Sequence, residues 1–285
     1  MDVIWPKPGK YIVAVSGGVD SMCLLHMLVE HGGYDLIVVH VDHGIREDSS
    51  NDTKLVEALA QKYNLPFIAT KLHLTKDASE QQARDYRYSF LFKQIASNGA
   101  IAILTAHHAD DVLETSIMNI RRGTDRYGAA GGMSREGIVR PLLNVRKNEL
   151  LEYSQEHNLK WREDSTNKDT KYTRNMIRHK IIPKIDVMAY QKLLSHLGEL
   201  NHKIDALIKV RTSIEGNTVR IQKSFLQQAS LREVEVLLAY ALRQAQPGIE
   251  LNQRRVAQVA RQIMLGTDKI SFSTGRQDCI IIEIR

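Results

Sequence analysis

Four short stretches of this 285-residue chain combine residue types that chemistry on a nucleotide requires. The first is SGGVDS, Ser16 to Ser21, which lies between two apolar runs. Gly17 and Gly18 let the backbone approach an anion closely, and free N–H groups at the start of a helix bind phosphate. The serine hydroxyls add donors. No lysine follows the glycines, so the stretch matches neither the GxxxxGK(S/T) loop nor the GxGxxG loop.

Asp20 lies inside this predicted anion site. Its carboxylate would repel a bare phosphate unless a Mg2+ ion lay between them. The stretch therefore favours ATP together with Mg2+, with Asp20 as a candidate ligand of the metal. The alternative is an ordinary glycine-rich turn between a strand and a helix, which is common where two glycines stand alone.

Two further polar stretches follow predicted strands. HVDHGIR, His40 to Arg46, lies where an adenylate would sit, and by itself it also fits a polar loop after a buried strand. AHHADDVLET, Ala106 to Thr115, holds two histidines and three acids. Asp111 and Glu114 are three residues apart and share one helix face, which suits an ammonium ligand or Mg2+. Acids are also favoured in the first turn of any helix, and Asp110 is expected to cap this one.

The fourth stretch, Lys168 to Lys184, is rich in Lys and Arg and contains a single acid. Lys171, Arg174 and Arg178 are candidates for contacts with RNA phosphates, and Tyr172 is available to stack on a base. The alternative is a basic helix face that is simply solvated.

The charge of the chain is unevenly distributed. Residues 1–114 carry 10 Lys+Arg and 15 Asp+Glu, whereas residues 115–285 carry 29 and 18, so the net charges are −5 and +11. A basic second part suits a polyanion, although it also aids solubility. We see no signal peptide and no apolar run near the roughly 20 residues of a membrane span. Without such a run, we expect no association with a membrane. The two cysteines, Cys23 and Cys279, are far apart in the sequence, which fits a reduced, cytoplasmic protein.

The first 145 residues alternate between short apolar runs and helical patterns. The predicted strands are residues 11–15, 35–41, 66–74 and 100–106, and the predicted helices are residues 22–30, 52–63, 79–96 and 110–122. Strands that are apolar throughout and separated by helices are typical of a parallel sheet covered on both faces. We therefore predict a doubly wound α/β domain over residues 1–145, with ligands at the carboxyl ends of its strands.

The remainder of the chain changes character. Helices are predicted at residues 147–157, 174–181 and 186–211, followed by a break at Gly216-Asn217, helices at 231–244 and 252–265, and strands at 269–273 and 279–284. We expect a helical extension over residues 146–213 and a small C-terminal α/β module over residues 214–285.

The chain resembles the tRNA(Ile)-lysidine synthetases, a branch of the N-type ATP pyrophosphatases, over about residues 10 to 185. The motifs that carry the resemblance, in order, are SGGVDS, VDHGIR at 41–46, EQQARDYRYSFL at 80–91, TAHHADDVLET at 105–115, RRG at 121–123, GGM at 131–133, RPLL at 140–143 and DSTNKDTKYTRNMIRHKIIP at 164–183. The resemblance implies an adenine nucleotide alpha hydrolase-like fold with a PP-loop that holds the pyrophosphate of ATP.

It also implies an activity. Such enzymes adenylate the C2 oxygen of the wobble cytidine in a CAU-anticodon tRNA(Ile) with release of pyrophosphate. The amine of free L-lysine then attacks C2, expels AMP and leaves lysidine. Members of the family are often homodimers, and the residues 146–213 would contact the tRNA.

Matching of motifs assigns the residues to three roles. ATP binding falls to Ser16, Gly17, Gly18, Val19, Asp20 and Ser21. Catalytic roles fall to Asp20, Asp42, Arg84, His107 and Asp111. Substrate binding falls to Asp111, Glu114, Arg122, Arg174, Asn175 and Arg178.

Two other functions fit parts of the pattern. A tRNA thiolase uses the same adenylation, but it generally needs a catalytic cysteine or a cluster bound by CxxC, and neither is present. A catalytically silent RNA-binding homologue should have lost its acids first, and here the acids remain.

Overall fold

The computed structural model describes residues 1–42, 44, 49–72, 80–121, 137–162, 176–246, 251–273 and 279–284. The described residues up to Leu194 form one compact unit and those from Ser195 onward form a second, so the division falls within one helix. None of the described helices has both the length and the apolar character that a membrane span requires.

The first unit contains a parallel sheet of five strands in the order β3-β2-β1-β4-β5. The strands are β1 (Gly9–Ala14), β2 (Tyr34–Asp42), β3 (Phe67–Lys71), β4 (Ala102–Leu104) and β5 (Ile138–Val139). The order and direction confirm the predicted doubly wound fold. β5 was not predicted, because two residues are too short to show a pattern; β5 is defined by its pairing with β4, Ile103 opposite Ile138 and Leu104 opposite Val139.

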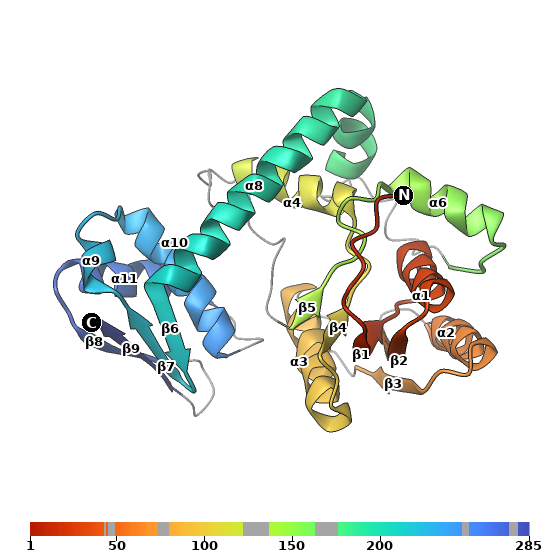
Figure 1. Ribbon diagram of the computed structural model, residues 1–285, viewed down its shortest axis with the longest axis horizontal. Helices are drawn as coiled ribbons and strands as arrows, with labels where there is room; N and C mark the ends of the chain where they lie inside the picture. The colour runs from red at the N-terminus through yellow and green to blue at the C-terminus, as the bar shows by residue number, and fades with distance from the viewer. Residues whose placement is uncertain are drawn as a thin grey trace. The chain divides into compact units, whose positions relative to one another are not determined.

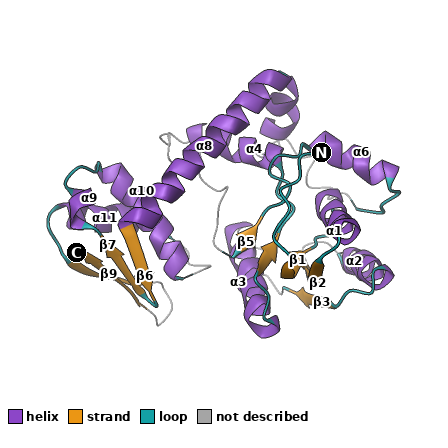
Figure 2. Cartoon of the chain, viewed as in Figure 1, coloured by secondary structure: helices purple, strands orange, loops and turns teal. Residues whose placement is uncertain are grey.

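Helices α1 (Val19–His31) and α2 (Ser50–Lys62) cover one face of this sheet, and α3 (Glu80–Asn98) covers the other (Figures 1 and 2). The unit also contains α4 (Ala109–Arg121), α6 (Lys147–Glu156), the first part of α8 (Val187–Arg211), a π-helical turn η2 (Ile177–Ile181) and a 3-10 turn η3 (Ile182–Lys184). The predicted helix at 174–181 is thus described only as a short π-helical turn. The predicted strands and the other predicted helices of this unit lie where the sequence places them, within a few residues.

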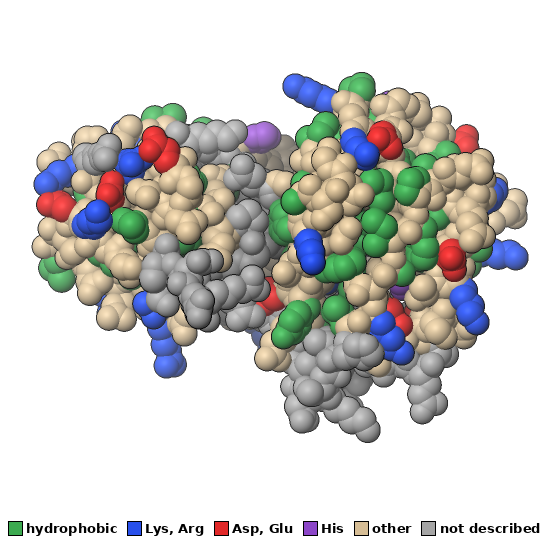
Figure 3. All heavy atoms as spheres, turned by 90° about the horizontal axis from the view of Figure 1, so that it is seen from below, with side chains coloured by type: hydrophobic (Ala, Val, Ile, Leu, Met, Phe, Trp, Pro, Cys, Tyr) green, Lys and Arg blue, Asp and Glu red, His purple; other side chains and the backbone are tan. Residues whose placement is uncertain are grey.

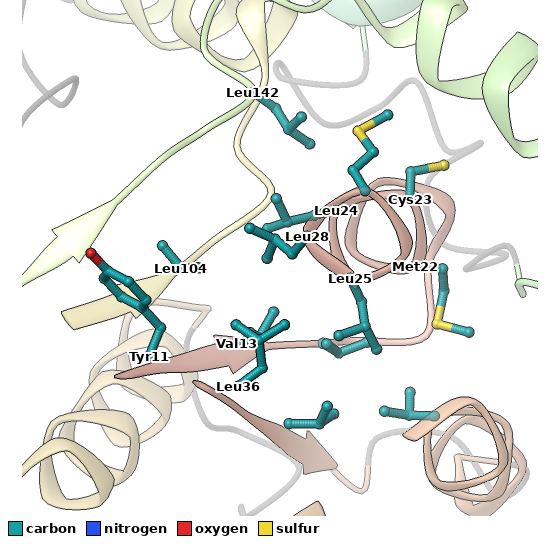
Figure 4. Close-up of a cluster of buried hydrophobic side chains, with 14 of the residues drawn as sticks. Tyr11, Val13, Met22, Cys23, Leu24, Leu25, Leu28, Leu36, Leu104 and Leu142 are labelled. Carbon is teal, nitrogen blue, oxygen red and sulfur yellow. The ribbon is translucent and has the colours of Figure 1, made fainter. Parts of the chain in front are cut away.

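Alternation along β1 explains why helices are needed on both faces. Tyr11 and Val13 point to the side of α1, where they pack with Leu24, Leu25 and Leu28 (Figure 4). Ile12 points to the other side and belongs to a second cluster with Tyr88 and Leu91 of α3. A strand buried on both faces excludes water from its whole length, which is why its sequence is continuously apolar.

The topology brings the candidate residues to one edge of the sheet. β1 and β4 are neighbours, and the order of the strands reverses between them. In open α/β sheets ligands bind at this reversal, outside the carboxyl ends of the strands. Ser16–Ser21 follow β1, Asp42 ends β2 and Ala106–Asp111 follow β4, so all three segments lie at the binding edge.

The second unit has a mixed four-stranded sheet in the order β6-β7-β9-β8. Its elements are the end of α8, β6 (Thr212–Glu215), β7 (Thr218–Ile221), α9 (Lys223–Leu226), α10 (Leu231–Ala245), α11 (Gln253–Met264), β8 (Lys269–Ser273) and β9 (Cys279–Ile284). A small C-terminal α/β module was predicted and is confirmed. The predicted break at Gly216-Asn217 is instead the tight turn of a hairpin, in which Gly216 adopts a positive φ of 56° that glycine tolerates.

Candidate active site

The SGGVDS loop closes on itself between β1 and α1. Ser21 Oγ accepts a hydrogen bond from Ser16 N at 3.1 Å and donates one to Gly18 O at 3.0 Å. Gly18 N donates to Ser16 Oγ at 3.4 Å. The loop ends at the N-terminus of α1, where the helix dipole favours negative charge. It therefore has the compact form that a phosphate cradle requires.

Gly17 allows this loop to approach α2. Its φ is +89°, and a Cβ added there would lie 3.4 Å from Asp52 Cβ and 3.6 Å from Val56 Cγ2. Residues other than glycine rarely adopt this backbone conformation. The Gly17 carbonyl accepts a hydrogen bond from Arg162 N at 3.0 Å, and Arg162 Nε lies 3.2 Å from Asp52 Oδ1. Both features hold the loop in place.

Asp20 is engaged by a lysine that the sequence did not indicate. Lys147 Nζ donates to both carboxylate oxygens of Asp20, at 2.7 and 2.9 Å. On another side, His108 Nε2 lies 3.7 Å from Asp20 Oδ2 and 3.5 Å from Asp111 Oδ2. A catalytic role was predicted for the neighbouring His107, but it is the buried His108 that lies between Asp20 of the PP-loop and Asp111 of the acidic stretch.

Asp111 and Glu114 share one face of α4, as their spacing predicts, and together they hold Arg178. Glu114 is fully buried; its Oε1 accepts from Arg178 Nε at 2.5 Å and its Oε2 from Arg178 Nη2 at 3.0 Å. Asp111 Oδ1 accepts from Arg178 Nη2 at 3.2 Å. Burial alone would raise the pKa of Asp111, but His108, His107 and Arg178 lower it overall. The acid pair therefore binds a planar cation within the protein itself.

Asp110 does not cap its own helix as expected. Its Oδ2 accepts from Lys147 N at 2.6 Å, and its Oδ1 accepts from Tyr190 OH at 2.9 Å. The carboxylate thus satisfies a free N–H at the start of α6 and ties α4 to α6 and α8. Burial and the charge of Asp110 raise the pKa of the Tyr190 phenol, so Tyr190 stays protonated and keeps donating.

His107 is buried and is influenced by the charges of several arginines. Burial and the guanidinium of Arg140 lower the pKa of His107 to about 3, and Arg84 and Arg87 of α3 act in the same direction. His107 is therefore neutral at pH 7, and its Nδ1 lies 2.9 Å from Thr105 Oγ1. The charges of three arginines thus act on one neutral imidazole, as a group that binds phosphate requires.

Asp42 closes the turn after β2. Its Oδ1 accepts from Gly44 N at 2.8 Å and its Oδ2 from Ser49 Oγ at 3.0 Å. Next to it, His40 Nδ1 donates to Val15 O at 2.8 Å and joins β2 to the start of the PP-loop. The catalytic role of Asp42 stays a prediction.

Three predicted substrate-binding residues, Arg122, Arg174 and Asn175, lie outside the described residues, as does the part of the basic stretch before Met176. On the face drawn in Figure 3, the described Lys and Arg side chains are interspersed with Asp and Glu and do not gather in one patch. The described residues on that face therefore do not add to the evidence for a polyanion-binding surface that the net charge of +11 in residues 115–285 provides.

The residues that the sequence analysis missed, Lys147, His108 and Tyr190, have little local signal. Lys147 is 127 positions from Asp20 and Tyr190 is 80 positions from Asp110. A cation in the first turn of a helix, as at Lys147, is unfavourable for the helix dipole, and this was the one signal available. His108 could be separated from His107 only by the direction of each side chain at the end of β4.

The sequence is similar to those of known proteins. A tRNA(Ile)-lysidine synthase of Solibacter usitatus (strain Ellin6076) is 35% identical over 250 residues, covering 83% of this chain and 57% of that protein. A protein of the same name from Thermotoga sp. (strain RQ2) is 40% identical over 188 residues, covering 62% of this chain and 45% of that protein. Another from Nitrosomonas europaea is 33% identical over 279 residues, covering 90% of this chain and 60% of that protein. The chain spans about half the length of the curated relatives it matches.

A solved structure shares the fold. The U34-tRNA thiolase NcsA from Methanococcus maripaludis matches with a TM-score of 0.51 and 18% identity, over 69% of this chain and 74% of that one. Residues 4–185, which contain the sheet, the SGGVDS loop and the acidic stretch, match the family described as the PP-loop domain. The chain belongs to this PP-loop domain family, whose members bind ATP.

Proposed function

We propose that this protein ligates L-lysine to C2 of the wobble cytidine of a CAU-anticodon tRNA(Ile), with ATP converted to AMP and pyrophosphate. The observation that carries the proposal is the paired carboxylates of Asp111 and Glu114, which bind a cationic group next to the PP-loop. An ATP-binding loop alone is common to many reactions. An adjoining site for a cation is what a reaction between an adenylate and lysine needs. The relatives named tRNA(Ile)-lysidine synthase support the same reading.

The first step concerns ATP. The cytidine O2 attacks the α-phosphorus, a bond forms between them, and the bond from the α-phosphorus to the β-phosphate oxygen breaks. Ser16–Ser21 hold the pyrophosphate that leaves. His107 with Arg84 and Arg140 would lie near the phosphate that stays on the cytidine, because a neutral imidazole donates a hydrogen bond while the guanidinium groups offset charge.

Asp20 is the predicted ligand of Mg2+ in this step, but both of its carboxylate oxygens accept hydrogen bonds from Lys147 Nζ. Among the described residues no group of three His, Cys, Asp or Glu side chains is placed to hold a metal ion. Proteins commonly bind Mg2+ through one or two carboxylates together with substrate phosphates and water. When bound, the ion would neutralise charge on the phosphates.

The second step concerns lysine. Asp111 and Glu114 would bind an ammonium group of lysine, which competes with the Arg178 guanidinium for the same oxygens. The attacking amine must be neutral, because a protonated amine has no lone pair. A buried position disfavours the charged form of an amine and lowers its pKa. Attack on C2 forms the C–N bond, breaks the C2–O bond and releases AMP.

The tRNA would meet the basic part of the chain. We expect Arg122, Arg174 and Asn175 to contact the tRNA. Arg178 was predicted to join them, but its guanidinium is engaged by Asp111 and Glu114, so we expect it to act at the lysine site. A cytoplasmic location follows from tRNA as the substrate, and a homodimer stays a prediction from the resemblance.

The test is a turnover assay with ATP, Mg2+, radiolabelled L-lysine and a transcript of CAU-anticodon tRNA(Ile). A methionine tRNA with the same anticodon is the control. Label in the tRNA(Ile) alone, with one AMP released per lysine incorporated, is the expected result. Release of AMP with no label in either tRNA would reject lysine as the nucleophile.

The state of Cys23 disfavours the thiolase alternative. Cys23 lies in α1, its Sγ donates to Leu150 O at 3.3 Å, and burial followed by the charge of Asp20 raises the pKa of the thiol to about 12. A thiol in this state is not a nucleophile at neutral pH. A silent RNA-binding homologue would not need the ion pairs that join Asp20, Asp111 and Glu114 to cations.

A further inference from the structure

Lys147 is the residue of the site whose position the preceding steps leave unexplained. It is the first residue of α6, yet its ammonium lies against the PP-loop, 2.7 and 2.9 Å from the two oxygens of Asp20. The pair is partly open to solvent, with side-chain exposures of 38% for Lys147 and 29% for Asp20. The ammonium is therefore at the surface of the site, where a ligand can reach it.

The surrounding structure holds this lysine in place. Its backbone N–H is bound by Asp110 Oδ2 at 2.6 Å, and Asp110 is in turn bound by Tyr190 OH at 2.9 Å. α6 packs on α1, and Leu150 O accepts from the Cys23 thiol at 3.3 Å. α1 begins at the PP-loop, so the loop and the lysine are attached to one packed pair of helices.

A lysine is an unfavourable choice for this position on grounds of stability. The N-terminal end of a helix carries a partial positive charge, so acids are favoured there and cations are not. Asp20 compensates the charge, but an uncharged residue at 147 would not need compensation. A cation placed against the helix dipole, above a loop of the phosphate-binding type, indicates a role toward an anion.

We propose that Lys147 supplies the cation that the PP-loop sequence lacks and binds the β- and γ-phosphates of ATP, while Asp20 holds its Nζ over the loop. The inference rests on the proposed function only in that ATP is cleaved between its α and β phosphates. In that step the leaving pyrophosphate gains charge as its bond to the α-phosphorus breaks. An ammonium ion beside it stabilises this charge most in the transition state.

Lys147 also changes the role expected of Asp20. A bare carboxylate repels phosphate, and Mg2+ was predicted between the two for that reason. In the structure Lys147 already neutralises that carboxylate, so the loop accepts an anion without a metal. Mg2+ bound to ATP then adds to the lysine and does not replace it.

The first experiment measures nucleotide binding by calorimetry, without tRNA or lysine. Lys147→Met is compared with the control variant Lys10→Met. Lys10 has the same side-chain exposure of 38% and also pairs with an aspartate, Asp35. That pair lies near the starts of β1 and β2, at the amino ends of the strands and away from the PP-loop. A lost charged hydrogen bond predicts that Lys147→Met weakens ATP and inorganic pyrophosphate about 10- to 100-fold. AMP, which lacks these phosphates, should change less than about 2-fold. Equal losses for ATP and AMP would overturn the proposal.

A second experiment separates contact with phosphate from neutralisation of Asp20. Lys147→Met is made in the Asp20→Asn background, where no carboxylate needs neutralising. If Lys147 touches phosphate, the double variant binds pyrophosphate about 10-fold or more weakly than Asp20→Asn alone. If the double variant and Asp20→Asn bind pyrophosphate equally, Lys147 acts only on Asp20 and the proposal is wrong.

The two proposals fail separately. Binding of ATP that depends on Lys147, with no lysine incorporated into tRNA(Ile), would reject the proposed function and leave the role of Lys147 intact. If a Lys147→Met protein incorporates lysine and binds pyrophosphate as tightly as the unaltered protein, the proposed function stands and the role of Lys147 is rejected.

Discussion

The buried pair of Glu114 with Arg178 makes one substitution especially informative. Glu114→Gln keeps the size and shape of the side chain but removes its charge. The glutamine amide has one oxygen, so it can accept only one of the two hydrogen bonds that Arg178 donates to Glu114 at 2.5 and 3.0 Å. The amide NH2 then faces an N–H of the guanidinium, donor against donor.

The magnitude follows from these contacts. A hydrogen bond between charged groups contributes about 1.5–3 kcal/mol, and Glu114 is fully buried, so solvent does not replace the lost bond. Arg178 is 31% exposed and keeps its contact with Asp111 at 3.2 Å, which limits the loss. We expect the free energy of unfolding to fall by about 2–3 kcal/mol, a large part of the roughly 5–15 kcal/mol of a typical protein.

The assay uses the two tryptophans of the chain, Trp5 and Trp161, which both lie in the first unit with Glu114. Trp5 stacks on His31 with ring centroids 4.0 Å apart, and Trp161 packs against the hydrophobic core. Denaturant unfolding followed by tryptophan fluorescence therefore reports on this unit. The same samples give the effect of L-lysine, which stabilises a protein that binds it in proportion to the logarithm of its concentration.

The control is Asp35→Asn, which removes a surface ion pair with Lys10 in the same unit, where Asp35 is 63% exposed. This variant should unfold like the unaltered protein, since exposed pairs contribute little. Glu114→Gln should unfold at lower denaturant and should lose most of the stabilisation by L-lysine. Equal unfolding of Glu114→Gln and Asp35→Asn would refute the energetic argument, and full stabilisation by lysine would refute the lysine site.

Three further outcomes are expected. Gly17→Ala forces a φ of +89° on a residue with a Cβ, so the free energy of unfolding should fall by about 1–2 kcal/mol. ATP affinity should fall with it, as unfolding and calorimetry would show. Tyr190→Phe leaves Asp110 without the hydrogen bond at 2.9 Å and should cost about 1–3 kcal/mol in the same unfolding assay; an unchanged midpoint would contradict a structural role for this bond. His107 has a folded-state pKa of about 3, below the 6.5 of a free histidine, so the unfolded chain takes up a proton first as the pH falls. The unaltered protein should therefore lose about 2 kcal/mol more than His107→Gln between pH 6.5 and 5, whereas parallel stability curves would show that His107 is not buried in its neutral form.

Much of the fold could be predicted because its signals are local. A strand buried on both faces must be apolar at every position, and the runs at 11–15, 35–41 and 100–106 show this directly. The Gly17-Gly18 pair between such a strand and a helix marks the PP-loop in the same way. β5 and the hairpin of β6 and β7 were not predicted, because each of these short strands is defined by the strand with which it pairs. Ile138 of β5 pairs with Ile103 of β4, and Thr218 of β7 pairs with Glu215 of β6.

The candidate site divides along the same line. The residues alone predict which segments follow β1, β2 and β4, and a parallel sheet must bring those segments to one edge. Which side chains pair there depends on the folded chain: Lys147 with Asp20, Arg178 with Glu114, and Tyr190 with Asp110. These partners are 127, 64 and 80 positions apart. Their pairing depends on where α6, η2 and α8 dock against α1 and α4, and docking is set by the packing of whole helix surfaces and not by any local pattern of residues.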